Sequence, residues 1–149
     1  MQELEKFRNI LDKVPARLKQ TASPQSKPLA DKWSAQEELG HLIDSAANNH
    51  QRIVRVQAED GLSLPGYQQD DWVKVHRYQQ RTWAELIDLW SSFNQQLLNA
   101  ASSVPDAAWS HTCRIANSDP MTLKFVFEDY LDHMLHHLKH IGIFVDDLR

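Results

Sequence analysis

Histidines crowd the C-terminal part of the chain, and imidazole nitrogens are common ligands of transition metals. Four of the eight histidines lie there as two interleaved His-x3-His pairs, His133/His137 and His136/His140. In a helix, residues four positions apart lie one turn above each other on the same face. Each pair could therefore hold one metal ion. A third histidine from another helix would complete a site with an open coordination position.

The helical phase of this segment separates the two pairs. At about 100° per residue, His137 falls within the apolar arc of the predicted helix and His133 lies at its edge. His140 lies further out, and His136 points mostly away. We therefore expect His133/His137 to face inward and His136/His140 to face solvent. A buried imidazole needs a polar partner, which could be a metal ion or a hydrogen-bonding group of another helix. The apolar arc consists of Leu123, Val126, Phe127, Tyr130, Met134, Ile141 and Phe144.

His41 is the best candidate for a third ligand. It lies early in a predicted second helix, on a face that continues through Ser45, Asn48 and Arg52. A polar stripe of this kind usually faces solvent, because the apolar stripe faces the core. The alternative is that the same polar face lines a wet cavity below a metal ion. The weaker candidates, in loops or on an apolar helix side, are His50, His76 and His111.

Two common metal sites do not fit the spacing. A zincin has Glu directly after its first helical histidine, whereas Met134 follows His133. A ferritin-like di-iron site needs Glu-x-x-His on each of two helices, and only Glu38 with His41 supplies one. The remaining possibility is a single ion with neutral nitrogen ligands, which suits Zn²⁺, Ni²⁺ or Fe²⁺ better than Ca²⁺ or Mg²⁺.

Other side chains could support such a site. Asp44, Asp129 and Asp132 are candidates for carboxylates that orient the imidazoles, or are surface charges. Arg52 could hold an anionic substrate group, or be an exposed helix arginine. Cys113 has no activating neighbour in the sequence beyond an arginine, and we do not expect it to be a nucleophile.

Four helical segments must position these residues. The first is predicted from about Gln2 to Gln20, with a kink or break at Pro15. The second begins with a capping box in which Ser34 is the N-cap and Glu37 lies three residues later, and it ends near residues 60–61.

The third helix begins with Thr82-Trp83-Ala84-Glu85, which repeats the capping-box pattern. A short strand is expected within residues 110–115. The fourth helix is predicted to begin with Asp119 as N-cap and Pro120 at the first helical position, and to end near Val145.

The long connection between the second and third helices is predicted as a loop over residues 62–77. Loops of this length in compact domains are often functional. Its aromatic side chains, with Tyr78 just beyond, could cover the cavity or simply pack against the helices; they are Tyr67, Trp72 and Tyr78. The pattern as a whole predicts an all-α protein in the form of a four-helix bundle, whose interior often houses metal sites.

Length and composition agree with this class. A chain of 149 residues suits a single domain, residues 1–149. The net charge of −4, with basic and acidic residues interspersed, gives no sign of a nucleic-acid surface. No uncharged run is long enough to span a membrane, and the first residues lack a signal-peptide layout. A lone cysteine, Cys113, excludes an internal disulfide, so we expect a cytoplasmic protein.

The segments 32–44 and 129–141 resemble the DinB-like superfamily, the small bacterial proteins of the DinB and YfiT kind. They read Lys-Trp-Ser-Ala-Gln-Glu-Glu-Leu-Gly-His-Leu-Ile-Asp and Asp-Tyr-Leu-Asp-His-Met-Leu-His-His-Leu-Lys-His-Ile. The shared features are a Trp-Ser-x-x-Glu helix start, a histidine within that helix and a terminal His-x3-His. The resemblance extends over nearly the whole chain. It implies a four-helix bundle of DinB/YfiT-like topology, often dimeric, with three histidines binding one divalent metal.

Carried onto the matching positions, the resemblance implies His41, His133 and His137 as the metal ligands. The family's second histidine of the pair precedes an Ile by four residues, as His137 precedes Ile141. The residue just before that Ile is often Gln in the family but is His140 here. His136/His140 therefore stays open as an alternative pair.

The expected function follows from that site. The resemblance implies an enzyme that acts on a small-molecule substrate. It would be either a metal-dependent transferase that uses a low-molecular-weight thiol or a metal-dependent hydrolase. Three neutral imidazoles leave the full charge of the ion to acidify a bound water or to activate a thiolate. The alternative is a non-catalytic helical bundle that serves as a binding or stress-response module with a structural metal or none.

Overall fold

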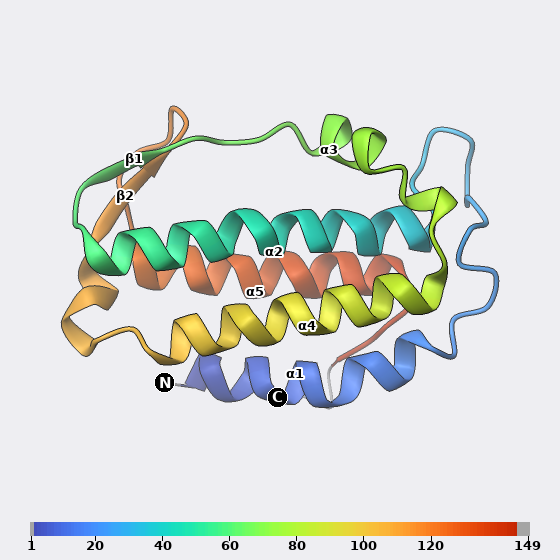
Figure 1. Ribbon diagram of the computed structural model, residues 1–149, viewed down its shortest axis with the longest axis horizontal. Helices are drawn as coiled ribbons and strands as arrows, with labels where there is room; N and C mark the ends of the chain where they lie inside the picture. The colour runs from blue at the N-terminus through green and yellow to red at the C-terminus, as the bar shows by residue number, and fades with distance from the viewer. Residues whose placement is uncertain (1, 146–149) are drawn as a thin grey trace.

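Four long helices run along the longest dimension of the molecule in the computed structural model, which describes residues 2–145 (Figure 1). α2 packs against both α4 and α5, and α1 packs against the same two helices. The predicted four-helix bundle is therefore confirmed. The helices are α1 (Gln2–Leu18), α2 (Ala35–Ala58), α4 (Trp83–Ser102) and α5 (Leu123–His140).

Shorter elements cover the two ends of α2. A three-stranded sheet at one end consists of β1 (Leu62–Leu64), β2 (Thr112–Ile115) and β3 (Met121–Thr122). β2 pairs in parallel with β1 and antiparallel with β3. Toward the other end, α3 (Gln69–His76) packs against α2 (Figure 1). Two 3-10 helices, Tyr78–Gln80 and Asp106–Ser110, complete the chain.

The connection 62–77 is not the structureless loop predicted from the sequence, because it contains β1 and α3. Within α3, Val73 is the buried residue, so this helix carries no apolar stripe that periodicity could detect. The strand expected within residues 110–115 is confirmed as β2.

Capping residues fix the start of the helix that carries His41. The Ser34 hydroxyl accepts a hydrogen bond from the Glu37 backbone N–H at 3.1 Å, and the Ser34 N–H donates to the Glu37 carboxylate at 2.9 Å. Thr82 is the N-cap of α4, and its hydroxyl accepts a hydrogen bond from the Glu85 N–H at 3.2 Å. The predicted N-caps of both helices are confirmed, and His41 lies about two turns into α2.

The N-terminal helix ends close to the predicted position, whereas the end of the last helix was predicted wrongly. α1 continues through Pro15 without a break and ends at Leu18. α5 ends at His140 rather than near residue 145, because Gly142 takes a left-handed φ of +89°. The backbone N–H of Ile143 then donates to the carbonyl of Leu138 at 2.9 Å, which closes the helix in a Schellman motif.

The start of α5 also differs from the prediction. Thr122, not Asp119, is the N-cap, and its hydroxyl accepts a hydrogen bond from the Phe125 N–H at 3.2 Å. Residues 121–122 pair with β2, so the chain is extended there and the helix begins only after the strand. A Pro at residue 120 was therefore a misleading signal.

An aromatic cluster holds the middle of the bundle together. Phe7 of α1 meets Phe127 and Tyr130 of α5 edge to face, at ring-centroid distances of 6.0 and 6.1 Å. The Tyr130 hydroxyl donates to the Asn94 side-chain oxygen of α4, and Trp90, one turn before Asn94 on the same helix, is fully buried. Burial of such rings contributes much of the packing energy of a small core.

Two details of the surface complete the description. Phe144, which the phase of the last helix placed in the apolar arc, lies beyond α5 and is 58% exposed. Among the helices of residues 2–145, none combines the length and apolar character that a bilayer crossing requires.

Candidate metal centre

The antiparallel contact between α2 and α5 brings three of the histidines together, His41, His133 and His137. Each offers one ring nitrogen, and these atoms lie within 4.8 Å of one another. The Nε2 atoms of His41 and His133 are 3.0 Å apart. His41 is fully buried, and His133 and His137 are half-buried. The predicted inward orientation of the α5 pair is confirmed, and its partner on α2 is His41.

The face of α2 that carries His41 is covered rather than exposed to solvent. His41, Asp44 and Ser45 are all buried, with exposed fractions of 0, 1 and 2%. Periodicity favoured the opposite, since a polar stripe usually faces water. Here α5 and the segment around Tyr67 and Tyr78 pack against that face, and their own polar groups bond to it. Asn48 and Arg52 further along the stripe are half-buried.

Burial sets the protonation state of the histidines. Desolvation, helped by the neighbouring His137 and His133, lowers the pKa of His41 to about 3. Desolvation and the proximity of His137 and His136 lower the pKa of His133 to about 4, although Glu38 opposes the shift. Both rings are therefore neutral at pH 7, and a neutral imidazole is the form that binds a metal ion.

A carboxylate orients the third ring. Glu38 Oε2 lies 2.6 Å from His137 Nδ1, and both side chains are 12% exposed. With the proton on Nδ1, the ring donates to the carboxylate and keeps the Nε2 lone pair for a ligand. This carboxylate–histidine arrangement is typical of metal-binding histidines. His133 Nδ1 has a weaker contact, 3.4 Å, to the Ser45 hydroxyl.

The donor set fits a divalent transition-metal ion. It consists of nitrogen atoms of neutral rings, which suit Zn²⁺, Ni²⁺ or Fe²⁺. Within residues 2–145, the buried Nδ1 of His41 has no hydrogen-bond partner. The other ring nitrogen, Nε2, contacts His133, and a bond from Nε2 to a metal ion would offset part of the cost of burying this ring. The assignment of these residues as ligands stays a prediction.

The carboxylates expected to support the site lie elsewhere. Asp132 is exposed and pairs with Lys6 at 3.4 Å, and Asp129 is exposed on α5. Asp44 is buried, but its Oδ1 accepts a hydrogen bond from the Tyr78 hydroxyl at 2.6 Å and lies 2.8 Å from His76 Nδ1.

Glu38 takes the supporting position instead. In the sequence, Glu38 stands out only as part of a Glu-x-x-His motif. The sequence signal for this supporting role is the position of Glu38 three residues before His41, on the same helix face.

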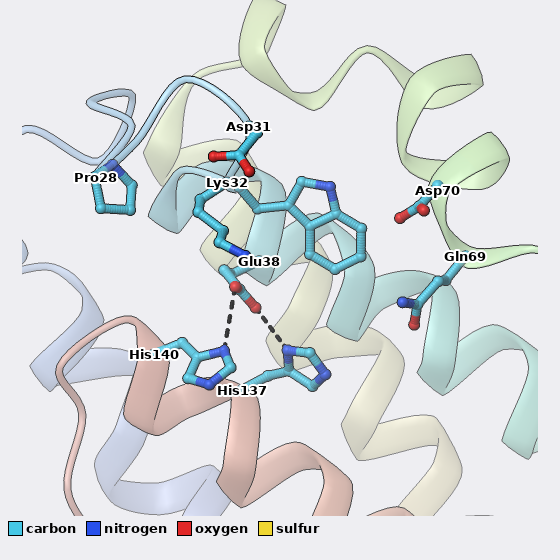
Figure 2. A pocket seen from close by; sticks show the side chains of 9 residues that line it. Pro28, Asp31, Lys32, Glu38, Gln69, Asp70, His137 and His140 are labelled. Atoms are coloured by element: carbon cyan, nitrogen blue, oxygen red, sulfur yellow. Dashed lines mark hydrogen bonds and ion pairs between the residues drawn. The ribbon is translucent and has the colours of Figure 1, made fainter.

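A pocket of about 610 Å³ opens beside the histidines (Figure 2). Glu38, His137 and His140 form one wall, and the Trp33 ring packs against His41 at a centroid distance of 5.0 Å. α3 contributes the opposite wall. The remaining lining residues are Pro28, Asp31, Lys32, Gln69 and Asp70.

The aromatic residues expected to cover the site lie over the polar face of α2, along from this pocket. Tyr67 is hydrogen-bonded to Ser45, and Tyr78 packs against Gly40. Trp72 contacts the Tyr67 ring at a centroid distance of 5.2 Å. The predicted cover therefore exists over Ser45 and Asp44, but these three rings do not line the pocket.

The remaining candidates are placed away from the three-histidine cluster. Arg52 Nη1 donates to Asn49 Oδ1 at 3.2 Å and lines a separate pocket of about 370 Å³. Cys113 is buried, and burial raises the pKa of its thiol, which agrees with the expectation that it is no nucleophile. The ring of His50 contacts Phe93, and His111 Nδ1 lies 2.8 Å from the Val56 carbonyl oxygen.

Comparison with known proteins places this arrangement in a family. The sequence model of the DinB superfamily matches residues 3–141, which span all four helices of the bundle. The chain belongs to the DinB superfamily. The resemblance read from its two histidine segments is thereby confirmed. No functionally curated protein matches the sequence of this DinB-superfamily chain.

A solved structure of the same kind has a similar fold. YfiT from Bacillus subtilis superposes with a TM-score of 0.69 over 93% of this chain and 87% of its own, at 18% sequence identity. YfiT is described as a probable metal-dependent hydrolase with an unusual four-helix bundle topology. At 18% identity, the likeness to YfiT shows that this DinB-superfamily protein has the same fold as YfiT.

Proposed function

We propose that this DinB-superfamily protein binds one divalent metal ion at His41, His133 and His137 and uses it to act on a small molecule. The observation that carries the proposal is the convergence of three ring nitrogens within 4.8 Å, at the wall of a pocket. Two of the rings are held neutral by burial. Such an ion, held by three protein ligands, would supply an acidified water or an activated thiolate at its open position.

The surrounding residues support a catalytic rather than a purely structural site. Glu38 fixes the orientation of His137 through Nδ1. The Trp33 ring packs against the rings of His41 and His137, at centroid distances of 5.0 and 6.4 Å. The pocket beyond offers Lys32 for an anionic group and Asp31 or Asp70 for a cationic one. Its volume of about 610 Å³ lies within the range of small-molecule sites.

Two reactions suit this site, and both place the substrate in the same pocket. In hydrolysis the nucleophile is water, as the description of YfiT suggests for that protein. In thiol transfer it is a low-molecular-weight thiol, which attacks a small electrophile. The open position can accept either nucleophile, so the proposal includes both.

The first experiment is metal analysis of untagged protein. We expect about one equivalent of zinc, nickel or iron, and its loss in His41→Ala. A His50→Ala variant removes an imidazole outside the cluster and should keep the metal. Metal content unchanged in His41→Ala would contradict the three-histidine site.

The second experiment separates catalysis from binding. Metal-loaded protein is assayed for ester and amide hydrolysis, and for conjugation of electrophiles with a panel of cellular thiols. Turnover that disappears in His41→Ala supports the proposal and identifies the nucleophile. Metal binding without turnover in any of these assays would favour a non-catalytic module in which the metal is structural.

A further inference from the structure

A second pocket, of about 370 Å³, lies along the C-terminal half of α2. Side chains of α2 form one side, and the chain that turns back from the end of α2 into β1 forms the other (Figure 1). Arg52 in this pocket follows His41 by three helical turns, about 16 Å along the helix axis, so the pocket is separate from the histidine cluster. Its polar lining residues are Asn48, Gln51, Arg52, Arg55 and Ser63.

The charged residues of this pocket are all positive. They are Arg52 and Arg55, and no carboxylate lines the pocket with them. Within residues 2–145, neither guanidinium group forms an ion pair, whereas Arg81 pairs with Glu85 at 3.2 Å. Like charges three or four positions apart on a helix repel each other. An anion bound by both arginines would relieve that repulsion.

Arg52 is half-buried without a counter-charge beside it. Burial lowers the pKa of its guanidinium group, and Tyr67, Cys113 and Asp129 oppose the shift. Burial raises the pKa values of Tyr67 and Cys113, so both side chains are neutral at pH 7. Asp129 is exposed on α5 and forms no ion pair with Arg52. A partly desolvated charge of this kind costs free energy that an anionic ligand would offset.

Neighbouring amides hold both guanidinium groups in place. Arg52 Nη1 donates to Asn49 Oδ1 at 3.2 Å, and Arg55 Nε donates to Gln51 Oε1 at 3.1 Å. Each bond uses one of the five N–H donors of a guanidinium group, so donors remain for a ligand. The planar fork of these donors matches the oxygens of a carboxylate or a phosphate group.

We propose that Arg52 and Arg55 form an anion-binding site, which takes the carboxylate or phosphate group of a small molecule in the pocket between α2 and β1. Asn48, Gln51 and Ser63 supply neutral polar groups for the remaining parts of the ligand. The volume of about 370 Å³ suits a small molecule, and the net charge of −4 on the chain argues against a nucleic acid. The site shares no residue with the three-histidine cluster and does not depend on the proposed function.

Anion binding is measured on full-length untagged protein stripped of metal with a chelator, so that no metal-bound anion contributes. The probes are inorganic phosphate and acetate, each titrated at constant ionic strength. Two-dimensional ¹H–¹⁵N NMR follows the backbone and the arginine Nε–H signals. We expect saturable shifts at Arg52, Arg55 and Ser63, and the tighter of the two probes identifies the group that the site prefers. Shifts that grow without saturation for both probes would overturn the proposal.

Variants then assign the binding to the two arginines. Arg52→Gln should weaken the affinity for the tighter probe by about tenfold or more, and Arg55→Gln several-fold. Arg8→Gln, which removes the same charge from an exposed position of α1, should bind like the wild type. Equal affinities in Arg8→Gln and in both pocket variants would overturn the site. Because Arg55 is exposed, its variant gives a test even if Arg52→Gln is misfolded by circular dichroism.

The His41→Ala variant separates this proposal from the metal site. It should bind the anion with the affinity of the wild type, although we expect it to lose the metal. Anion binding that persists without metal supports a separate site. Loss of anion binding in a folded His41→Ala variant would overturn the separation.

Discussion

The two His-x3-His pairs of α5 have the same residue type and spacing, yet their surroundings differ. His133 and His137 face α2, where His41 and Glu38 meet them, and burial lowers the pKa of His133 to about 4. His136 and His140 face solvent, and His140 has a 3.3 Å contact to the outer oxygen of Glu38. Spacing alone thus makes a pair that can hold a metal. Burial and neighbouring groups decide whether the rings are held neutral and fixed in orientation.

The largest expected effect separates the two pairs directly. His137→Ala removes a ligand of the inner site, and we expect the affinity for the tightly bound metal to fall by more than about 100-fold, since loss of even an outer partner costs 10–100-fold. His136→Ala on the same helix is the matched control and should keep the tight ion. Competition with a chelating dye measures both constants. Equal losses of metal affinity in the two variants would show that the inward and outward pairs do not differ in metal binding.

A smaller effect is expected from the residue that both pairs contact. Glu38→Gln keeps the shape of the side chain but weakens its acceptance of the His137 Nδ1–H, so the tight metal affinity should fall by roughly 10–100-fold. The same dye competition, combined with circular dichroism to verify the fold, provides the measurement. An unchanged tight affinity would mean that Glu38 does not support His137.

Packing next to His41 should matter to the inner site and to the stability of the whole domain. A Cβ added at Gly40 would overlap the Tyr78 ring, so Gly40→Ala must shift Tyr78 and disturb its hydrogen bond to Asp44. We expect a loss of about 1–3 kcal/mol in the free energy of unfolding, measured by urea denaturation. The control Tyr78→Phe removes only the hydroxyl and should cost about 1 kcal/mol. Full stability in Gly40→Ala would contradict the close approach.

The smallest effect near neutral pH concerns protonation of the inner rings. Their pKa values, about 3 for His41 and about 4 for His133, lie below the unfolded value of 6.5. Between these limits the unfolded chain binds more protons than the folded one, so the stability of the metal-free protein rises with pH. The contribution of these rings to stability should be fully present above pH 6.5 and should decrease progressively toward pH 3–4. His41→Asn should flatten this profile in urea denaturation at several pH values, and an identical profile would contradict the assigned burial effect.

The fold was largely predictable, because its signals are local. The Ser34 capping box and the Thr82 N-cap were read correctly, since each depends on residues three positions apart. The start of α5 was misread because pairing of residues 121–122 with β2, a contact distant in sequence, overrides the Asp119-Pro120 signal. α3 was missed because it has too few buried residues to show a period. Errors occur where tertiary contacts compete with local preference.

The site was predictable in part, for the same reason. Helical phase correctly pointed His133 and His137 inward, because α5 has one clearly apolar face. The same argument favoured solvent for His41, and the structure buries it completely. Periodicity assumes that polar residues seek water, and it fails where polar residues of one helix are satisfied by those of another. The superfamily resemblance, not the period, pointed to His41, and the structure brings its ring against the pair.

Local sequence patterns are enough to indicate a histidine pair at helical spacing, a third histidine behind a strong helix cap, and a helical bundle to hold them. Which of these groups meet depends on the tertiary packing of the helices. The antiparallel packing of α2 on α5 sets Glu38 against His137, His41 against His133 and Ser45 beneath them. That register arises from side-chain packing across the whole interface between the helices. No local pattern encodes it, because it depends on residues about 90 or more positions apart in the chain.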